Sequence, residues 1–153
     1  MARLIHFRAV LPYRYAAGTA ASRFFAELRD HKRIMAQRCT KCGKTWIPPR
    51  PLCGPCYEPL SDWVEVGPRG TLIGYTVVRH AFLDPLTGKE RPVPYGYGFI
   101  RLDGADFFLQ HFLAEQRIEN LSLGLRVEAV FRAERQGNFG DIECFRILDE
   151  GEQ

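Results

Sequence analysis

Residues 38–56 have the sequence RCTKCGKTWIPPRPLCGPC, and this stretch decides what kind of fold the chain begins with. It holds two Cys-x-x-Cys pairs, Cys39 with Cys42 and Cys53 with Cys56, separated by ten residues. Each pair forms a tight turn that aims two thiolates at one point, and two such turns complete a tetrahedral shell around zinc. The segment between them suits a short hairpin, because residues 45–47 are strand-like and three prolines stiffen the return. The spacing therefore predicts a zinc ribbon.

The second pair, CGPC, also has the sequence of the redox-active turn of thioredoxins. A thioredoxin needs a single Cys-x-x-Cys after a buried strand and at the start of a helix, within a βαβ domain. Here Pro59 lies three residues after Cys56 and no βαβ alternation follows, so the metal interpretation is favoured over the redox one. Four thiolates leave no open coordination position for water or substrate, so we expect a structural rather than a catalytic zinc.

The chain before the ribbon predicts a helix and then a strand. Residues 19–33 have the pattern of an amphipathic helix that Thr19 or Ser22 can cap, and residues 34–38 extend as a strand into the first cysteine pair. Residues 1–18 have the character of an extended arm with little core of its own. The apolar stripe of the helix consists of Phe24, Phe25 and Leu28.

The chain after the ribbon predicts strands. Five segments are rich in β-branched and aromatic residues, and a short connector with one helical turn separates the third from the fourth. This arrangement is typical of an OB-fold barrel. We therefore expect three segments: an arm and helix over 1–36, a zinc ribbon over 37–62 and an OB-fold over 63–149. The five predicted strands are 70–83, 92–102, 106–113, 125–135 and 141–148.

Charge divides the chain in the same way. Residues 1–57 carry eleven Lys or Arg and two acids, whereas residues 58–153 carry ten basic and sixteen acidic side chains. The two signs suggest two modules with different tasks. No apolar run approaches the ~20 residues that span a bilayer, and the basic, proline-interrupted start lacks the apolar centre of a secretory signal. We expect a cytoplasmic protein with no membrane partner, a compartment in which clustered thiols are commonly metal ligands.

These features together resemble a known family, the acyl-CoA-associated proteins built of a rubredoxin-like zinc ribbon followed by an OB-fold. The resemblance covers about residues 20–148 and is carried by the helix with Phe24 and Phe25, the four-cysteine frame, and the strands GTLIGYTVV and LGLRVEAVF. Gly54 departs from the family, in which Pro often follows the third cysteine, but the ligands are intact. The resemblance implies a mainly β fold with an N-terminal helix, a rubredoxin-like zinc ribbon and a five-stranded OB-fold barrel.

The resemblance also implies an accessory role. Members of the family accompany thiolase-superfamily enzymes, which make or break carbon–carbon bonds in acyl-CoA thioesters, and the partner supplies the reactive cysteine and histidines. The implied partners are a thiolase-like catalytic subunit and an acyl-CoA substrate, with coenzyme A bound at the complex. The candidate contacts with acyl-CoA or the partner come from the basic ribbon, the arm and one strand: Arg38, Lys41, Lys44, Arg50, Tyr13, Tyr15, Tyr95 and Tyr97.

Two of these groups have alternative interpretations. The basic ribbon could contact coenzyme A phosphates or an acidic partner surface. Alternatively, it is a solvated face whose positive charge offsets that of the thiolates. Both interpretations stay open. In the strand, Tyr95, Tyr97 and Phe99 share one face, as base-stacking platforms do, with Gly96 and Gly98 opposite. Zinc ribbons and OB-folds do bind single-stranded nucleic acid, but an acidic barrel repels phosphate. We therefore favour barrel or interface packing and expect no nucleic-acid partner.

No catalytic set stands out in the sequence. A Ser-His-Asp order, paired carboxylates and a glycine-rich phosphate loop are all missing from the pattern. Cys144 would be a nucleophile only with a base nearby, and core packing is the favoured interpretation. His80 and His111 could form an acid/base pair, but we favour barrel or interface histidines without chemistry. The sequence therefore predicts a chain without catalytic machinery of its own.

Overall fold

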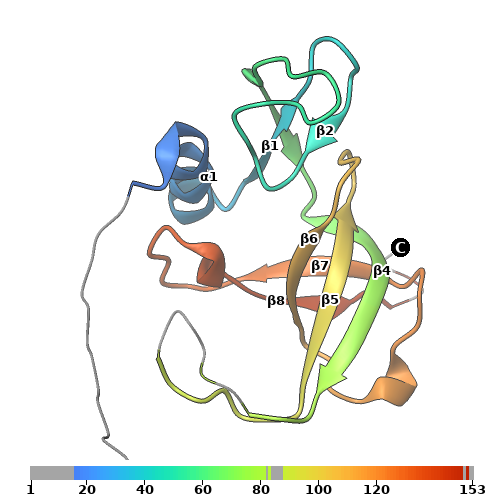
Figure 1. Ribbon diagram of the computed structural model, residues 1–153. Helices are drawn as coiled ribbons and strands as arrows, with labels where there is room; N and C mark the ends of the chain where they lie inside the picture. Colours follow the sequence, from blue (N-terminus) through green and yellow to red (C-terminus); the bar gives the residue numbers. More distant parts are fainter. Residues whose placement is uncertain (1–15, 82, 84–87, 150, 152–153) are drawn as a thin grey trace, which may run out of the picture.

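A computed structural model describes residues 16–81, 83, 88–149 and 151, and its first element is a helix that packs on the rest of the chain (Figure 1). Helix α1 spans Gly18–His31, close to the predicted 19–33. The predicted cap is wrong: the N-cap is Ala17, because the helix begins before Thr19 and places both Thr19 and Ser22 inside it. The helix ends at His31, and the left-handed φ of 56° at the C-cap residue Lys32 stops further helical hydrogen bonding.

The apolar face of α1 packs on a turn near the end of the chain. Phe24 and Leu28, one helical turn apart, are both buried. The rings of Phe24 and Phe25 lie 5.6 Å and 5.1 Å from the ring of Phe139. Phe139 begins the short 3-10 helix η2, Phe139–Asp141. The helix therefore attaches to the barrel half through an aromatic cluster.

A small antiparallel sheet follows α1. Its order is β2-β1-β3, with β1 at Ile34–Arg38, β2 at Thr45–Trp46 and β3 at Asp62–Val66. Strand β1 is where the sequence places it, and β2 is one residue shorter. Strand β3 was not among the expected strands. The predicted boundary after residue 36 falls inside β1, and the predicted boundary after residue 62 falls at the first residue of β3. The division of the chain into three segments stays a prediction.

Five strands close into a barrel in the order β4-β5-β6-β8-β7, the OB-fold connectivity that the sequence predicts. All neighbouring pairs are antiparallel except β6 with β8. The 3-10 helix η1, Ile118–Asn120, is the predicted helical turn between the third and fourth barrel strands. The fold is mainly β with one N-terminal helix, as expected. The barrel strands are β4 Arg69–Val78, β5 Tyr95–Leu102, β6 Leu109–Leu113, β7 Arg126–Phe131 and β8 Ile142–Ile147.

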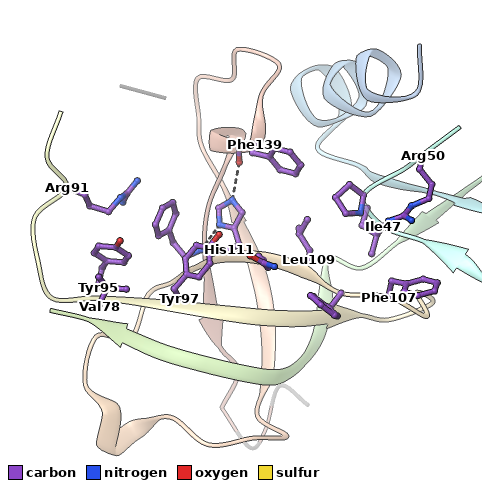
Figure 2. Close-up of a pocket in the computed structure, with 14 residues that line it drawn as sticks. Ile47, Arg50, Val78, Arg91, Tyr95, Tyr97, Phe107, Leu109, His111 and Phe139 are labelled. Carbon is purple, nitrogen blue, oxygen red and sulfur yellow. Dashed lines mark hydrogen bonds between the residues drawn. The ribbon is translucent and has the colours of Figure 1, made fainter. Parts of the chain in front are cut away.

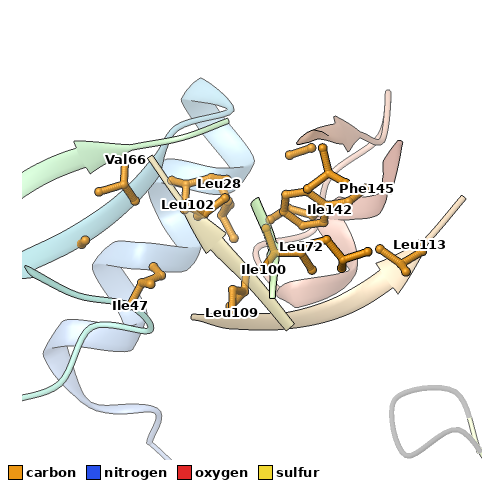
Figure 3. Packing of buried hydrophobic residues seen from close by; sticks show 14 of the residues in the cluster. Leu28, Ile47, Val66, Leu72, Ile100, Leu102, Leu109, Leu113, Ile142 and Phe145 are labelled. Carbon is orange, nitrogen blue, oxygen red and sulfur yellow. The ribbon is translucent and has the colours of Figure 1, made fainter. Parts of the chain in front are cut away.

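One apolar core joins helix, small sheet and barrel. Leu28 of α1, Ile47 after β2 and Val66 of β3 belong to the same buried cluster as the barrel residues Ile100 and Phe145 (Figure 3). The described residues contain no helix long and apolar enough to cross a membrane.

Glycines on the inner face of β5 let the barrel close tightly. A Cβ added at Gly96 would lie 2.2 Å from the backbone oxygen of Glu115, and one at Gly98 would lie 2.7 Å from Leu72 Cδ1. Another segment of backbone therefore approaches β5 closely at Gly96. Because side chains alternate along a strand, Tyr95 and Tyr97 point to the outer face.

Candidate metal centre and adjoining groove

The two Cys-x-x-Cys turns have the same backbone hydrogen bonds. In the first, the amide of Gly43 donates to Cys39 O at 2.8 Å, and the amide of Cys39 donates to Lys44 O at 2.9 Å. In the second, Tyr57 and Cys53 donate the equivalent bonds, to Cys53 O and Glu58 O, both at 2.9 Å. Such a turn needs a left-handed residue directly after the second cysteine. Gly43 has φ 73° and Tyr57 has φ 54°, so a non-glycine residue occupies the strained position of the second turn.

The sulfur atoms of the four cysteines converge on one point. All four Sγ atoms lie within 4.8 Å of one another, and Cys42 Sγ is 3.7 Å from Cys53 Sγ. A tetrahedral zinc with Zn–S bonds of about 2.3 Å needs sulfur atoms about 3.8 Å apart. Cys39 and Cys53 are completely buried, whereas Cys42 is exposed. The donor set and its spacing therefore fit a metal ion, with no ligand missing from the shell.

The four thiols affect one another's ionisation. Hydrogen bonding from the backbone amide of Cys42 lowers the pKa of Cys39 to about 7. The hydrogen bond with the Cys42 side chain, followed by burial, raises the pKa of Cys56 to about 12. Thiolates this close repel one another, so all four ionise together only around a cation.

A groove of about 720 Å³ lies between the ribbon and the outer face of β5 and β6. The register pairs Tyr97 of β5 with Phe112 of β6, and both residues line the groove. Figure 2 shows Arg91 and Arg50 at opposite ends of the row of lining side chains. The lining is mostly apolar and consists of Ile47, Pro48, Arg50, Val78, Arg91, Tyr95, Tyr97, Phe107, Phe108, Leu109, Gln110, His111, Phe112 and Phe139.

Aromatic rings form one side of the groove. The ring of Phe112 lies 5.6 Å from that of Tyr95 and 5.3 Å from that of Tyr97, both edge-to-face. The guanidinium of Arg91 lies 3.7 Å from the centre of the Phe112 ring. Burial raises the pKa of Tyr97, so its hydroxyl stays protonated and can donate a hydrogen bond. The wall can therefore accept a flat or apolar group and still offer polar atoms.

The structure brings together three of the eight predicted contact residues. Arg50, Tyr95 and Tyr97 line the groove. The predicted contacts that do not line it are exposed on the ribbon, namely Arg38, Lys41 and Lys44. The other two predicted contacts, Tyr13 and Tyr15, lie outside the described residues.

Sequence reasoning missed the other half of the groove. Arg91, Phe107 and Phe112 come from loops and a strand that the sequence gives no reason to place beside Arg50. One signal was available, because the predicted strand 106–113 is itself rich in aromatic residues.

The histidines and the cysteine that were candidates for acid/base or nucleophilic chemistry do not have the surroundings that such chemistry needs. The Nδ1 atom of His111 accepts a hydrogen bond from the amide of Phe112 at 2.9 Å, and Nε2 therefore donates to Phe139 O at 3.1 Å. Burial lowers the pKa of His111, so the ring is neutral. His80 is exposed after the end of β4. Cys144 is half-buried rather than in the core, and burial raises its thiol pKa.

The chain is similar in sequence to a known domain family and to two DUF35 scaffold proteins. Residues 63–132 match the family model of the ChsH2 C-terminal OB-fold domain. A DUF35 domain-containing scaffold protein of Methanocaldococcus jannaschii is 28% identical over 112 residues, covering 72% of this chain and 75% of the relative. A protein with the same description from Pyrococcus furiosus is 27% identical over 115 residues, covering 75% and 80%.

Solved structures also share the fold. A DUF35-family protein of unknown function from Sulfolobus solfataricus has a TM-score of 0.60 at 21% identity, covering 86% of this chain and 87% of that one. The Ltp2-ChsH2(DUF35) aldolase has a TM-score of 0.60 at 23% identity, covering 87% of this chain and 98% of the matched chain. The family resemblance expected from the cysteine frame and the strands is confirmed.

Proposed function

Because the chain is a relative of the DUF35 scaffold proteins and its barrel matches the ChsH2 C-terminal OB-fold domain, we propose that it is a non-catalytic accessory subunit of a thiolase-superfamily complex. The complex makes or cleaves carbon–carbon bonds in acyl-CoA thioesters in the cytoplasm. The aldolase assembly among the structural relatives, Ltp2-ChsH2(DUF35), supports a partnership with an enzyme. The catalytic partner in this proposal is a thiolase-like subunit, and the chain forms a hetero-oligomer with it.

The groove carries the proposal. It lies on the second and third barrel strands, the face with which OB-folds commonly bind ligands. An acyl-CoA thioester has an apolar acyl part and a long arm that ends in phosphates. The aromatic wall of Tyr95, Tyr97 and Phe112 suits the first part, and Arg50 at the ribbon end suits the second. Exposed Lys41 and Lys44 add positive charge on the ribbon itself.

The division of labour follows from the groups that line the groove. Both nitrogens of His111, which lines the groove, are engaged in hydrogen bonds with backbone atoms. Cys144 is not among the lining residues, and burial raises its thiol pKa, which disfavours a thiolate. Among the described residues, the groove therefore offers positioning contacts rather than a nucleophile and a base. In the proposed complex the partner supplies the reactive groups, and this chain orders and orients the thioester.

The metal in this proposal is zinc, held by Cys39, Cys42, Cys53 and Cys56 in a structural role. Four soft thiolate donors at tetrahedral spacing support zinc. We propose that the chain is divided into three segments: the arm and helix over 1–36, the ribbon over 37–62 and the OB-fold over 63–149. The remaining predicted contacts, Arg38, Tyr13 and Tyr15, are assigned to the partner surface.

The finer proposal is that the acyl group of the substrate is benzoylsuccinyl. The resemblance of the cysteine frame and strands extends to the small subunit of a 2-benzoylsuccinyl-CoA thiolase, an enzyme of anaerobic toluene degradation. An aromatic acyl group that also carries a carboxylate suits a groove with aromatic walls and an arginine at each end.

Co-expression with a thiolase-like protein encoded beside this chain tests the proposal. We expect the two to co-purify as one species in size-exclusion chromatography, and benzoyl-CoA to protect the partly exposed Tyr97 from chemical modification. The chain contains its own control for this protection, since exposed Tyr57 lies outside the groove and should react equally with and without benzoyl-CoA. Separate elution of the two proteins at micromolar concentration, with Tyr97 unprotected by benzoyl-CoA, would contradict the proposal.

Single-stranded nucleic acid is the second candidate ligand. The observation in its favour is that aromatic rings lie on the strand face that OB-folds use for oligonucleotides, and two arginines line the same groove. Titration of fluorescent single-stranded DNA and RNA near physiological salt distinguishes the two. Sub-micromolar binding that is lost in a Tyr95→Ala, Tyr97→Ala variant would favour nucleic acid over acyl-CoA.

A further inference from the structure

A tryptophan of the ribbon stacks on a phenylalanine of the barrel half. Trp46 lies in β2, between the two cysteine pairs, and its ring stacks on that of Phe107 with centroids 3.6 Å apart and planes at 14°. The guanidinium carbon of Arg50 lies over the Trp46 ring, 4.2 Å from its centre. The indole is 6% exposed, and its Nε1 has no hydrogen-bond partner among the described residues. The ring is therefore held by its faces.

The same tryptophan touches the metal centre. Trp46, Phe107 and Leu60 form one apolar cluster with the buried ligands Cys39 and Cys53. In the second cysteine turn, a Cβ added at Gly54 would come within 3.3 Å of the Trp46 ring. A change in the geometry of either cysteine turn therefore moves atoms that contact the ring.

Asp106 adds a polar link beside the stack. Its carboxylate Oδ2 accepts a hydrogen bond from the amide of Thr45 at 2.7 Å, and its own amide donates to Thr45 O at 3.1 Å. Thr45 directly precedes Trp46, and Asp106 directly precedes Phe107. Two adjacent residues of β2 are therefore joined to two adjacent residues of the β5–β6 connection.

This contact also builds the groove. Ile47, Pro48 and Arg50 form the ribbon side of the groove, and they belong to the segment that connects Trp46 to Cys53. Phe107, from the connection between β5 and β6, also lines the groove. One end of the ribbon wall is therefore fixed by the Trp46–Phe107 stack and the other end by a metal ligand.

We propose that the metal centre and the groove are coupled: Trp46, Phe107 and Asp106 transmit metal occupancy to the shape of the groove, so the metal regulates ligand binding. Asp106, Phe107 and Trp46 act as positioning residues. Linkage makes the effect reciprocal, so a ligand in the groove tightens the metal by the same factor. The regulation concerns the groove of the proposed function, but the coupling itself requires no particular ligand.

A tryptophan reporter and hydrogen exchange test the coupling without any ligand. Trp46 and Trp63 are the two tryptophans, so a Trp63→Phe variant leaves Trp46 as the sole emitter. On removal of zinc by a chelator, we expect red-shifted Trp46 emission and amide exchange about tenfold faster at Ile47, Arg50 and Phe107. Exchange at Val127 and Phe145, in the barrel core, should not change. Unchanged emission and unchanged exchange at Phe107 in the metal-free protein would overturn the proposal.

Variants then test the named residues in zinc-loaded protein. Phe107→Leu and Asp106→Ala should retain one zinc per chain and a folded barrel, yet show the faster exchange at Ile47 and Arg50. Asp106→Asn, which keeps an oxygen acceptor, should lie close to wild type. The matched control is Asp149→Ala, at an exposed aspartate beyond the barrel. Wild-type exchange in both Phe107→Leu and Asp106→Ala would refute the role of these residues.

The reciprocal measurement uses benzoyl-CoA as the probe. At saturating benzoyl-CoA, we expect the zinc dissociation constant, measured against a competing chelator, to fall about tenfold in wild type. In Phe107→Leu it should fall less than about twofold. Bound benzoyl-CoA with an unchanged zinc affinity would contradict the coupling. If benzoyl-CoA does not bind the zinc-loaded protein at all, the proposed ligand is wrong, and the exchange comparison still decides the coupling.

Discussion

Replacing Gly96 with alanine should destabilise the barrel by an amount that the structure bounds. An added Cβ would lie 2.2 Å from the backbone oxygen of Glu115 and 3.0 Å from Leu113 Cβ. Ordinary carbon–oxygen contacts begin at about 3.3 Å, so β5 and the segment after β6 must separate by about 1 Å. Because the obstacle is backbone rather than a flexible side chain, we expect the cost typical of an overpacked core, about 1–3 kcal/mol.

Thermal unfolding of the zinc-loaded protein measures this cost. For a chain of this size, about 1–3 kcal/mol corresponds to a fall in Tm of roughly 2–12 °C. Gly151→Ala is the matched control, because nothing lies within 4 Å of a Cβ added there. The shift of β5 should also displace the outward-facing Tyr95 and Tyr97 and weaken benzoyl-CoA binding. A Tm within about 1 °C of wild type would refute the steric reasoning.

The other predictions concern the metal site, the second cysteine turn and an ion pair. Cys39→Ala should remove the zinc. Metal analysis of the purified protein would detect this loss as a fall from about one zinc per chain. One zinc per chain retained in the variant would contradict the proposed metal site. Tyr57→Gly should raise the Tm, because glycine tolerates φ 54° without strain. Gly43→Ala should lower the Tm, because alanine is strained at φ 73°. Tm shifts of the opposite signs would contradict the requirement for a left-handed residue after the second cysteine of each turn. Hydrogen bonding and charge from Arg126 lower the pKa of Asp103. A carboxyl with a depressed folded-state pKa contributes stability above its unfolded pKa and loses it as pH falls through the folded value. Urea unfolding should therefore show wild type losing stability below about pH 4 and Asp103→Asn losing less; parallel pH profiles would contradict this role.

The features that depend on local sequence were predictable. The cysteine frame follows from spacing alone, and the four sulfur atoms do converge as that spacing requires. The barrel strands follow from alternation and β-branched residues, and they close into the predicted type of barrel. Errors at this level are small and local: the cap of α1 differs because the helix begins at Gly18, one residue before Thr19.

The features that depend on distant contacts were not predictable. Strand β3 mixes exposed acids with half-buried residues, and it forms because β1 offers a free edge. The groove joins Arg50 of the ribbon to Phe107 and Phe139, residues far apart in the sequence. Tertiary packing brings these residues together, and no local propensity specifies it. The pairing of Trp46 with Phe107 belongs to the same class.

Reconstitution of acyl-CoA cleavage tests the central claim most directly. Thioester cleavage would be followed with the thiolase-like partner alone, with this chain alone and with both, under zinc-loaded conditions. An accessory subunit that orders the partner's site and completes the acyl-CoA groove predicts turnover only when both chains are present. Turnover by this chain alone, or full turnover by the partner without it, would contradict the account.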